Sequence, residues 1–274
     1  MTSPLYLVAA GVLDGAGPGS LVSLDGAEGR HAATVRRARA GEPIDVADGA
    51  GTVARGSVDA VGRDAVGRDT VTVRVAAVDR VPVPAPRLVL VQALAKGGRD
   101  ELAVETATEL GVDAVVPWQA SRCVVIWTGE RGERSRRRWE DTVRAATKQS
   151  RRSWLPPVGP VLSTASLAAR VSAAVAGGGS GLVLHEDARA ALTGVALPRP
   201  ASPQSGGDGT GPAGGTCPEV LVVVGPEGGI SEPELEQLTA AGGCAVRLGP
   251  QVLRSSSAGA AALAVLSARL GRWG

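Results

Sequence analysis

The chain has 274 residues and a net charge of +2, so it is long for a single domain of about 100–200 residues, and its charge alone indicates no partner. No uninterrupted apolar run reaches the ~18 residues of a membrane span, and the amino terminus lacks a positively charged leader. We therefore expect a cytoplasmic protein that does not enter a membrane. The three cysteines are far apart and form no Cys-x-x-Cys pair, so we expect neither a disulfide framework nor a metal site.

The first 80 or so residues are typical of a small β-rich domain. Short apolar runs predict strands at Leu5–Ala9, Ile44–Ala47, Thr52–Val58 and Thr70–Val78, and the Asp-Gly of DVADGAG predicts a tight hairpin. The segment GRHAATVRRARAG predicts one short helix that ends at Gly41. Several short strands with one helix indicate a small barrel.

A stiff, proline-rich linker at Val81–Pro86 suggests a boundary between a first domain, residues 1–82, and a second, residues 83–274. After it, strand-like runs alternate with helical patterns, which favours a mostly parallel sheet with helices on both faces. The predicted strands are Leu88–Leu94, Ala114–Pro117, Leu182–Leu184, Val220–Val224 and Ala245–Leu248. The predicted helices are about Asp100–Leu110, Glu133–Gln149, Ala165–Ala176, Glu232–Ala241 and Ser256–Leu270. A Gly-, Pro- and Ser-rich stretch of about 198–218 predicts a flexible insertion.

Positive charge is concentrated in two places. Between Arg131 and Arg152 there are nine Lys or Arg residues and three acids, a net charge of +6. A second basic run holds Arg30, Arg36, Arg37 and Arg39. Clustered arginine is typical of proteins that bind a phosphate backbone, but a solvated helix face explains the same pattern.

Three predicted strand ends carry loops suited to a ligand. In GPEGGIS, Gly225 ends a strand, and Gly228 and Gly229 have no Cβ to keep a ligand away from the backbone. Ser231 and Glu234 then match a capping box at the start of a helix. Taken alone, this turn is equally typical of an ordinary strand-to-helix connection.

The other two strand ends are LVLHED, with His185 and Glu186, and LGPQVLRSSS, in which Ser255 or Ser256 is expected to cap the last helix. Ligands of open α/β sheets bind where the carboxyl ends of strands open into such loops. We therefore expect the three loops to form one pocket. The sequence contains neither a phosphate loop nor a Gly-x-Ser-x-Gly nucleophile elbow, and no dinucleotide Gly-x-Gly-x-x-Gly turn follows a predicted strand.

Taken together, these segments resemble the RsmE family of bacterial methyltransferases in the SPOUT superfamily. The resemblance spans nearly the whole chain and rests on HAATVRRARAGEPIDVADGAG, QALAKGGRDELAVETATELGVDAVVPWQASRC, KQSRRSWLP, LVVVGPEGGIS and LGPQVLRSSSA. It implies an α/β fold, with a SPOUT-type knotted parallel-sheet domain preceded by a small PUA-like RNA-binding β-barrel. It also implies a homodimer that uses S-adenosyl-L-methionine to methylate N3 of one uridine in 16S rRNA, free or in the small ribosomal subunit.

The same resemblance assigns the cofactor loops. The residues expected to contact the cofactor are Leu184, His185, Glu186, Gly225, Pro226, Glu227, Gly228, Gly229, Leu248, Gly249, Val252, Leu253 and Arg254. Family members often have Thr-Glu-Thr after the Leu-Arg pair, where this chain has three serines from Ser255 to Ser257. A glutamate at that place is therefore not essential in this chain.

Methylation of N3 needs a proton to leave a weakly acidic N–H, and the negative charge spreads to the flanking carbonyl oxygens, where an arginine can stabilise it. We expect Arg254 and Arg152 to contact uracil or phosphate. Glu227 is a candidate base, although a structural role for Glu227 or proton transfer to water is an equal alternative. The residues expected to contact RNA are Arg30, His31, Arg36, Arg37, Lys96, Arg122, Gln149, Arg151 and Arg152.

Two other functions fit the same sequence. One is a SPOUT enzyme that methylates a ribose 2′-oxygen with the same cofactor loops. The other is a non-catalytic RNA-binding protein of ribosome assembly.

Overall fold

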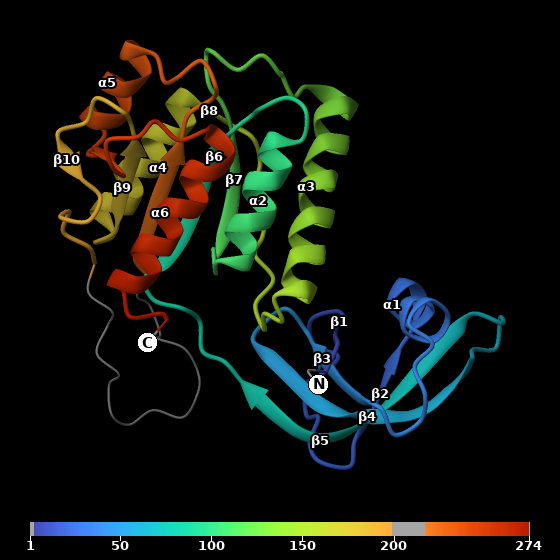
Figure 1. Ribbon diagram of the computed structural model, residues 1–274. Helices are drawn as coiled ribbons and strands as arrows, with labels where there is room; N and C mark the ends of the chain where they lie inside the picture. The colour runs from blue at the N-terminus through green and yellow to red at the C-terminus, as the bar shows by residue number, and fades with distance from the viewer. Residues whose placement is uncertain (1–2, 199–216, 274) are drawn as a thin grey trace. The chain divides into compact units, whose positions relative to one another are not determined.

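The computed structural model describes residues 3–198 and 217–273. The chain forms two compact units (Figure 1). One consists of Met1–Val83 and Thr147–Leu155, and the other of Pro84–Ala146 and Pro156–Gly274. The first unit thus includes a short segment from the middle of the chain, which the position of the linker does not predict. Most of the predicted insertion at 198–218 lies outside the described residues.

The first unit is built on a five-stranded sheet in the order β1-β3-β4-β5-β2. Its neighbouring strands are antiparallel, apart from the parallel pair β1–β3. The strand bounds are β1 Leu5–Leu7, β2 Leu21–Leu24, β3 Pro43–Ala47, β4 Thr52–Arg63 and β5 Asp69–Arg80. Strand β2 was not predicted, because the run LVSL is short and alternates only twice between exposed and buried positions.

The predicted helix of this unit begins and ends earlier than its sequence suggests. An α-helical turn, α1 (Gly26–Arg30), continues as the π-helical segment η1 (His31–Val35). The chain then leaves the helix through Arg37, which has a left-handed φ of 55°. The prediction that this helix ends at Gly41 is therefore wrong, since Arg37 itself adopts the conformation expected of a terminating glycine.

The predicted hairpin between β3 and β4 is confirmed. The Asp48 carboxylate accepts hydrogen bonds from the backbone N–H groups of Ala50 (2.7 Å) and Thr52 (3.0 Å), which closes the turn. A Cβ added to Gly51 would lie 2.6 Å from the indole of Trp154, so glycine is required for the tryptophan to pack there. The segment ending at Leu155 is anchored on this hairpin by backbone hydrogen bonds, which explains its place in the first unit.

The second unit is a seven-stranded sheet in the order β10-β12-β9-β11-β6-β7-β8, and all neighbouring strands are parallel. The predicted parallel α/β fold is confirmed. The strand bounds are β6 Arg87–Ala93, β7 Ala114–Gln119, β8 Leu162–Ser163, β9 Ser180–Leu184, β10 Ala190–Ala191, β11 Glu219–Val224 and β12 Cys244–Arg247. The central strands β6 and β11 are buried almost throughout, as expected for a sheet covered on both faces.

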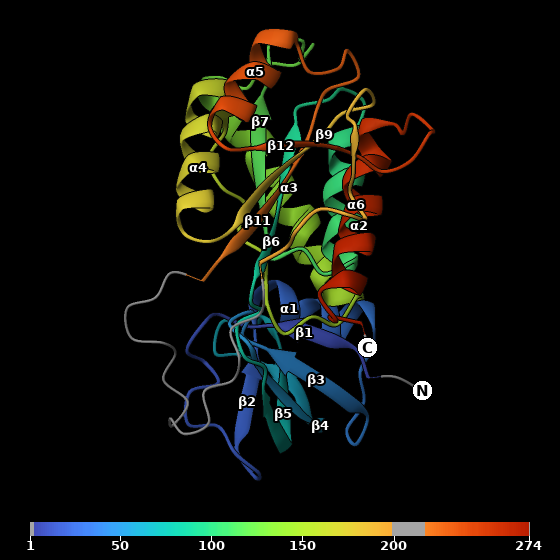
Figure 2. The same cartoon turned by 90° about the vertical axis from the view of Figure 1, so that its left-hand side faces the viewer.

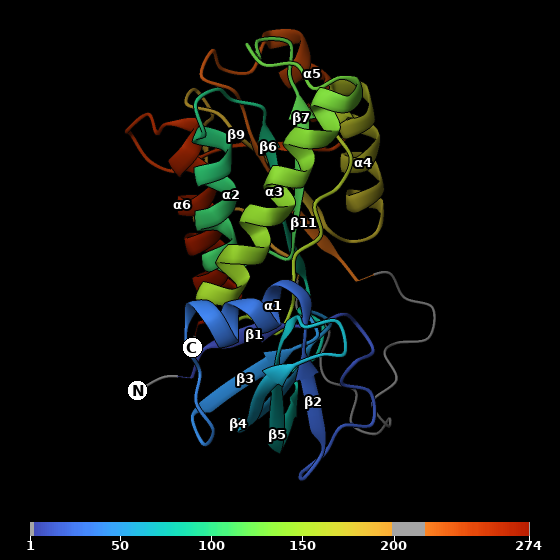
Figure 3. The same ribbon diagram turned by 90° about the vertical axis from the view of Figure 1, so that its right-hand side faces the viewer.

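Helices cover both faces of this sheet. Figure 2 shows α4 and α5 on one face, and α2 and α6 on the other; Figure 3 shows α3 beside α2. The helix bounds are α2 Arg99–Glu109, α3 Gly129–Gln149, α4 Thr164–Ala176, α5 Glu232–Ala240 and α6 Ser255–Arg269. Among the described residues, none of the helices combines the length and apolar character needed to cross a membrane.

Close packing of α6 on the sheet depends on a glycine. A Cβ added to Gly259 would lie 2.8 Å from Leu90 Cδ1 of β6 and 3.4 Å from Val224 Cγ2 of β11. Such approaches are too short for unstrained packing, so a side chain here must displace the helix or its neighbours.

We expect Gly259→Val to lower the free energy of unfolding by about 1–3 kcal/mol, because an overpacked core cannot relax fully. Urea denaturation followed by circular dichroism measures the change. The matched control is Ala268→Val in the same helix, since Ala268 is exposed and its substitution should cost well under 1 kcal/mol. Equal stabilities of the two variants would contradict this account of the packing.

Candidate functional site

Because all strands of the second unit are parallel, their carboxyl ends meet at one edge of the sheet. The loops that follow β9, β11 and β12 surround a cavity of about 550 Å³ at this edge. That volume suits a small-molecule ligand, for which sites of about 300–1,000 Å³ are typical. The three strand ends singled out in the sequence therefore lie around one cavity.

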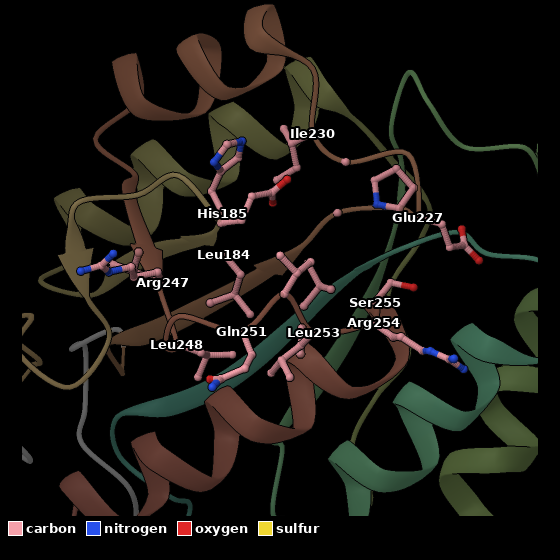
Figure 4. A pocket seen from close by; sticks show the side chains of 18 of the residues that line it. Leu184, His185, Glu227, Ile230, Arg247, Leu248, Gln251, Leu253, Arg254 and Ser255 are labelled. Atoms are coloured by element: carbon pink, nitrogen blue, oxygen red, sulfur yellow. The ribbon is translucent and has the colours of Figure 1, made fainter.

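The cavity has an apolar middle and charged sides. Figure 4 shows Leu184 and Leu253 near its centre, Arg247 on one side, and Glu227 and Arg254 on the side next to α2. Such a combination of apolar walls and a few polar groups is typical of sites that bind an organic ligand with a defined orientation.

The turn after β11 is shaped by its glycines. A Cβ added to Gly225 would lie 2.6 Å from Ile230 Cγ1, and Gly229 has a φ of 74°. These positions let the chain reverse tightly before α5 begins. The predicted capping box of Ser231 and Glu234 is present at the start of that helix.

Glu234 also joins this turn to two neighbouring loops. Its carboxylate accepts hydrogen bonds from the Ser121 N–H (2.8 Å) and hydroxyl (2.7 Å) and from the Thr164 hydroxyl (2.9 Å), as well as from Ser231. Burial alone would raise the pKa of Glu234, but these donors outweigh it and lower the pKa to about 2. Glu234 is therefore ionised at neutral pH and acts as a structural anchor for the turn.

A second contact from the loop after β7 holds the same turn. Arg122 Nη1 donates a hydrogen bond to the carbonyl oxygen of Gly228 (2.9 Å). A Cβ added to Gly228 would lie 3.3 Å from Arg122 Cβ, so the two chains pass close to each other. Arg122 was predicted to contact RNA; its guanidinium here supports the backbone of the turn.

The loop after β6 contributes a charge to the cavity. Arg99, the first residue of α2, forms an ion pair with Glu227 across 2.8 Å between Nη1 and Oε1. Burial would raise the pKa of Glu227, but the hydrogen bond and charge of Arg99, with the charge of Lys96, lower it. Because a lowered pKa makes a weaker base, this pairing disfavours Glu227 as a proton acceptor.

The last loop leads directly into α6. Arg254 is the N-cap residue of this helix, with an extended backbone (φ −65°, ψ 150°), and no side chain caps the helix there. The prediction that Ser255 or Ser256 is the cap is therefore wrong, because the helix begins one residue earlier than expected. As a result, the Arg254 side chain projects from the rim of the cavity, as Figure 4 shows.

Most of the residues predicted to contact the cofactor line this cavity. They are Leu184, His185, Glu186, Gly225, Pro226, Glu227, Gly229, Leu248, Gly249, Val252, Leu253 and Arg254. Gly228 does not line it; its carbonyl faces Arg122. Their contact with a cofactor remains a prediction.

The residues predicted to contact RNA are divided between the two units. Lys96 and Arg122 belong to the second unit, at the same sheet edge as the cavity. The others belong to the first unit: Arg30, His31, Arg36, Arg37, Gln149, Arg151 and Arg152. Arg152, which was also predicted to act in catalysis, is not among the residues that line the cavity.

Several cavity residues were not predicted. Arg99 is the most informative, because it adds a cation beside Glu227; Gln251 and Ser255 add polar groups. In the sequence, Arg99 follows two glycines and begins a helical pattern, as many solvated arginines do. Its place beside Glu227 follows only from the position of β6 next to β11 in the sheet, and the sequence does not reveal that strand order.

Comparison with known proteins assigns a domain family to each of the two units. The family profile described as "RNA methyltransferase domain" matches residues 83–267. The profile described as "RNA methyltransferase PUA domain" matches residues 24–66. The first unit therefore contains a PUA domain, and the second contains an RNA methyltransferase domain.

Individual relatives agree with these matches. The ribosomal RNA small subunit methyltransferase E of Mycobacterium bovis is 45% identical over 255 residues, which are 93% of this chain and 89% of the relative. The protein of the same name from Bacillus subtilis is 31% identical over 66% of this chain and 65% of the relative. A crystal structure of such an enzyme from Neisseria gonorrhoeae, bound to S-adenosyl methionine, superposes with a TM-score of 0.77 at 25% identity over 98% of both chains.

The anchoring role of Glu234 predicts a pH dependence of stability. Since its folded-state pKa lies below its ordinary value of 4.5, its contribution is complete above about pH 4.5 and is lost as the pH falls towards 2. Glu234→Gln should lower the free energy of unfolding at pH 7 by on the order of 2 kcal/mol and flatten its rise between about pH 2 and 4.5.

Urea unfolding at a series of pH values measures this effect. The control is Glu236→Gln in the same helix, because Glu236 is exposed and its substitution should leave the pH profile unchanged. A Glu234→Gln variant with the wild-type profile would exclude the anchoring role.

Proposed function

This chain belongs to the ribosomal RNA small subunit methyltransferase E family, and on that premise we propose that it methylates N3 of one uridine in 16S rRNA, with S-adenosyl-L-methionine as the methyl donor. One observation carries the proposal: the cavity at the carboxyl edge of the parallel sheet is lined by three loops from three separate strands. The donor would supply a methyl group already activated on sulfur, so the protein has to bind, orient and stabilise charge.

The cavity is suited to that donor. Its volume accommodates a ligand of nucleoside size, and its apolar middle, with Leu184 and Leu253, can bury flat or aliphatic groups. The glycine turn from Gly225 to Gly229 exposes backbone groups that can hydrogen-bond such a ligand. The carboxylate of Glu227 and the cations Arg99 and Arg254 lie at one side, next to α2.

Recognition of RNA is assigned to the PUA domain and to basic side chains of both units. Arg30, Arg36 and Arg37 follow one another on α1, η1 and the turn after them, and all three are exposed. His31 is also exposed, and its ring lies 5.7 Å from that of Tyr6. Exposed arginines of this kind can position a phosphate backbone without reading its sequence.

Two features follow from family membership. We propose that the last strands and loops of the second unit form the knot of SPOUT enzymes; the support is that β12 pairs with β9, although β11 precedes it in the chain.

We also propose that the protein is a homodimer in the cytoplasm. An exposed apolar surface beside the cavity supports the dimer, since Val252 is 77% exposed and Leu253 is 40% exposed. Multi-angle light scattering at micromolar concentration tests the dimer, and a monomeric mass would exclude it.

The product distinguishes this proposal from methylation of a ribose. We expect mass spectrometry of nucleosides from 16S rRNA, treated with the purified protein and the donor, to detect one 3-methyluridine per molecule. A 2′-O-methyl nucleoside in its place would support the ribose alternative. No methylation of rRNA or of assembled small subunits would support the non-catalytic alternative.

Binding of the donor tests the site itself. Calorimetry should detect one donor per chain, and Ala258→Leu, which enlarges a side chain on the cavity wall, should weaken binding about tenfold or more, since ~1.4 kcal/mol of overpacking has that effect. The control is Ala268→Leu, at an exposed position of the same helix. Equal affinity of the two variants would place the donor elsewhere.

A further inference from the structure

We infer that Arg99 is a catalytic residue, whose guanidinium contacts the target uracil and stabilises the negative charge that develops on its carbonyl oxygens as N3 is methylated. The inference rests on the proposed function and deepens it by assigning a role to one more residue of the same site. No sequence motif singled out this residue. It is carried by the ion pair with Glu227, by the position of Arg99 on the cavity wall and by the charges around it.

The chemistry requires such a group. The N3–H bond breaks and its proton passes to solvent, while the N3–methyl bond forms and the methyl–sulfur bond breaks, with its electron pair left on sulfur. As the proton departs, negative charge spreads from N3 to the two flanking carbonyl oxygens of uracil. A donor fixed in place before the reaction stabilises that charge without reorganisation.

The backbone fixes where Arg99 begins. Gly97 and Gly98 have φ values of 70° and 74°, so the chain turns sharply after β6 and α2 starts at Arg99. Strand β6 is the neighbour of β11 in the parallel sheet, and their loops therefore emerge side by side. This arrangement brings Arg99 to Glu227, although 128 positions separate them in the chain.

The ion pair orients the guanidinium and leaves most of it available. Only Nη1 donates to Glu227, and a guanidinium has five N–H groups in a rigid, planar fork. The Arg99 side chain is 49% exposed, so the remaining donors can reach a ligand. A free N–H of the fork can donate to a carbonyl oxygen of uracil while Nη1 stays on Glu227, whereas a lysine would offer only a point charge.

The charges beside Arg99 favour an anionic substrate. Figure 4 shows Arg254 on the same side of the cavity as Glu227, the partner of Arg99. Lys96 acts electrostatically on Glu227. Arg99 and Lys96 thus both act on the Glu227 carboxylate, and Arg254 adds a further positive charge to this side of the cavity. Arg247 lies on the opposite side and does not contribute there.

The experiment uses the full chain and 16S rRNA assembled with small-subunit proteins, transcribed with either uridine or 5-fluorouridine. Fluorine at C5 withdraws electrons and makes N3–H more acidic, so less stabilisation is needed. We expect Arg99→Gln to lower the maximal methylation rate on uridine rRNA by on the order of 10²-fold, with donor affinity within twofold of wild type by calorimetry. On 5-fluorouridine rRNA the deficit relative to wild type should shrink at least fivefold.

Two further variants separate charge stabilisation from structural support. Glu227→Gln removes the orienting partner but keeps the cation, so its deficit should be smaller than that of Arg99→Gln. Arg189→Gln is the matched control, since Arg189 is exposed and does not line the cavity; it should retain wild-type rates on both RNAs.

The inference is overturned if Arg99→Gln retains the wild-type rate, if its deficit is the same on both RNAs, or if Glu227→Gln reproduces it in full. Loss of donor binding in Arg99→Gln would also overturn it, because Arg99 would then belong to the donor site. Failure of the proposed function looks different: the wild-type protein would produce no 3-methyluridine on either RNA.

Discussion

The parallel register of the seven-stranded sheet is the constraint on which the site depends. Because every neighbouring pair is parallel, the carboxyl ends of β12, β9, β11, β6 and β7 emerge at the same edge and in that order. Each of these strands then contributes a different element. Strands β9, β11 and β12 supply the walls of the cavity, β6 supplies Arg99, and β7 supplies the loop that supports the turn at Gly228. An antiparallel strand among them would send its loop to the opposite edge.

Support for the glycine turn comes from outside it. Glycines let the backbone approach a ligand, but they also leave it free to move, and the order of the turn therefore has to be imposed by neighbours. Two contacts do this: the ionised Glu234 accepts hydrogen bonds from Ser121 and Thr164, and Arg122 donates to Gly228. All of these partners come from other loops of the same edge, so the cavity and its support form one connected hydrogen-bonded unit.

The sequence predicted the fold class and the three loops because these depend on local patterns. Buried runs such as Val220–Val224 are continuous in the sequence, and the capping box that begins at Ser231 lies within four consecutive residues. Contacts between distant segments left no such signal. Neither the pairing of Arg99 with Glu227 nor the packing of Trp154 on Gly51 could be predicted, since each depends on which strands and segments are neighbours.

Local patterns failed at two helix ends, where an arginine takes the position expected of another residue type. Arg37 ends the first helix in a left-handed conformation that is favoured for glycine, so the sequence pointed to Gly41 instead. Similarly, three serines suggested a cap for α6, but Arg254 occupies that position and its side chain is directed to the cavity rim. Arg37 thus stands where a glycine is expected at a helix end, and Arg254 where a serine is expected at a helix start.

The energetics of the Arg99–Glu227 pair indicate what the pair does. Both side chains are partly exposed, at 49% and 33%, and a single exposed ion pair contributes only about 0–1 kcal/mol to stability. The fold of this edge depends far more on buried Glu234 than on this pair. The effect of Glu227 is therefore on orientation: it restricts a long, flexible side chain to one region of the cavity wall. Because the same contact lowers the pKa of Glu227, orienting the cation and accepting a proton are competing roles for this carboxylate, and the geometry favours the first.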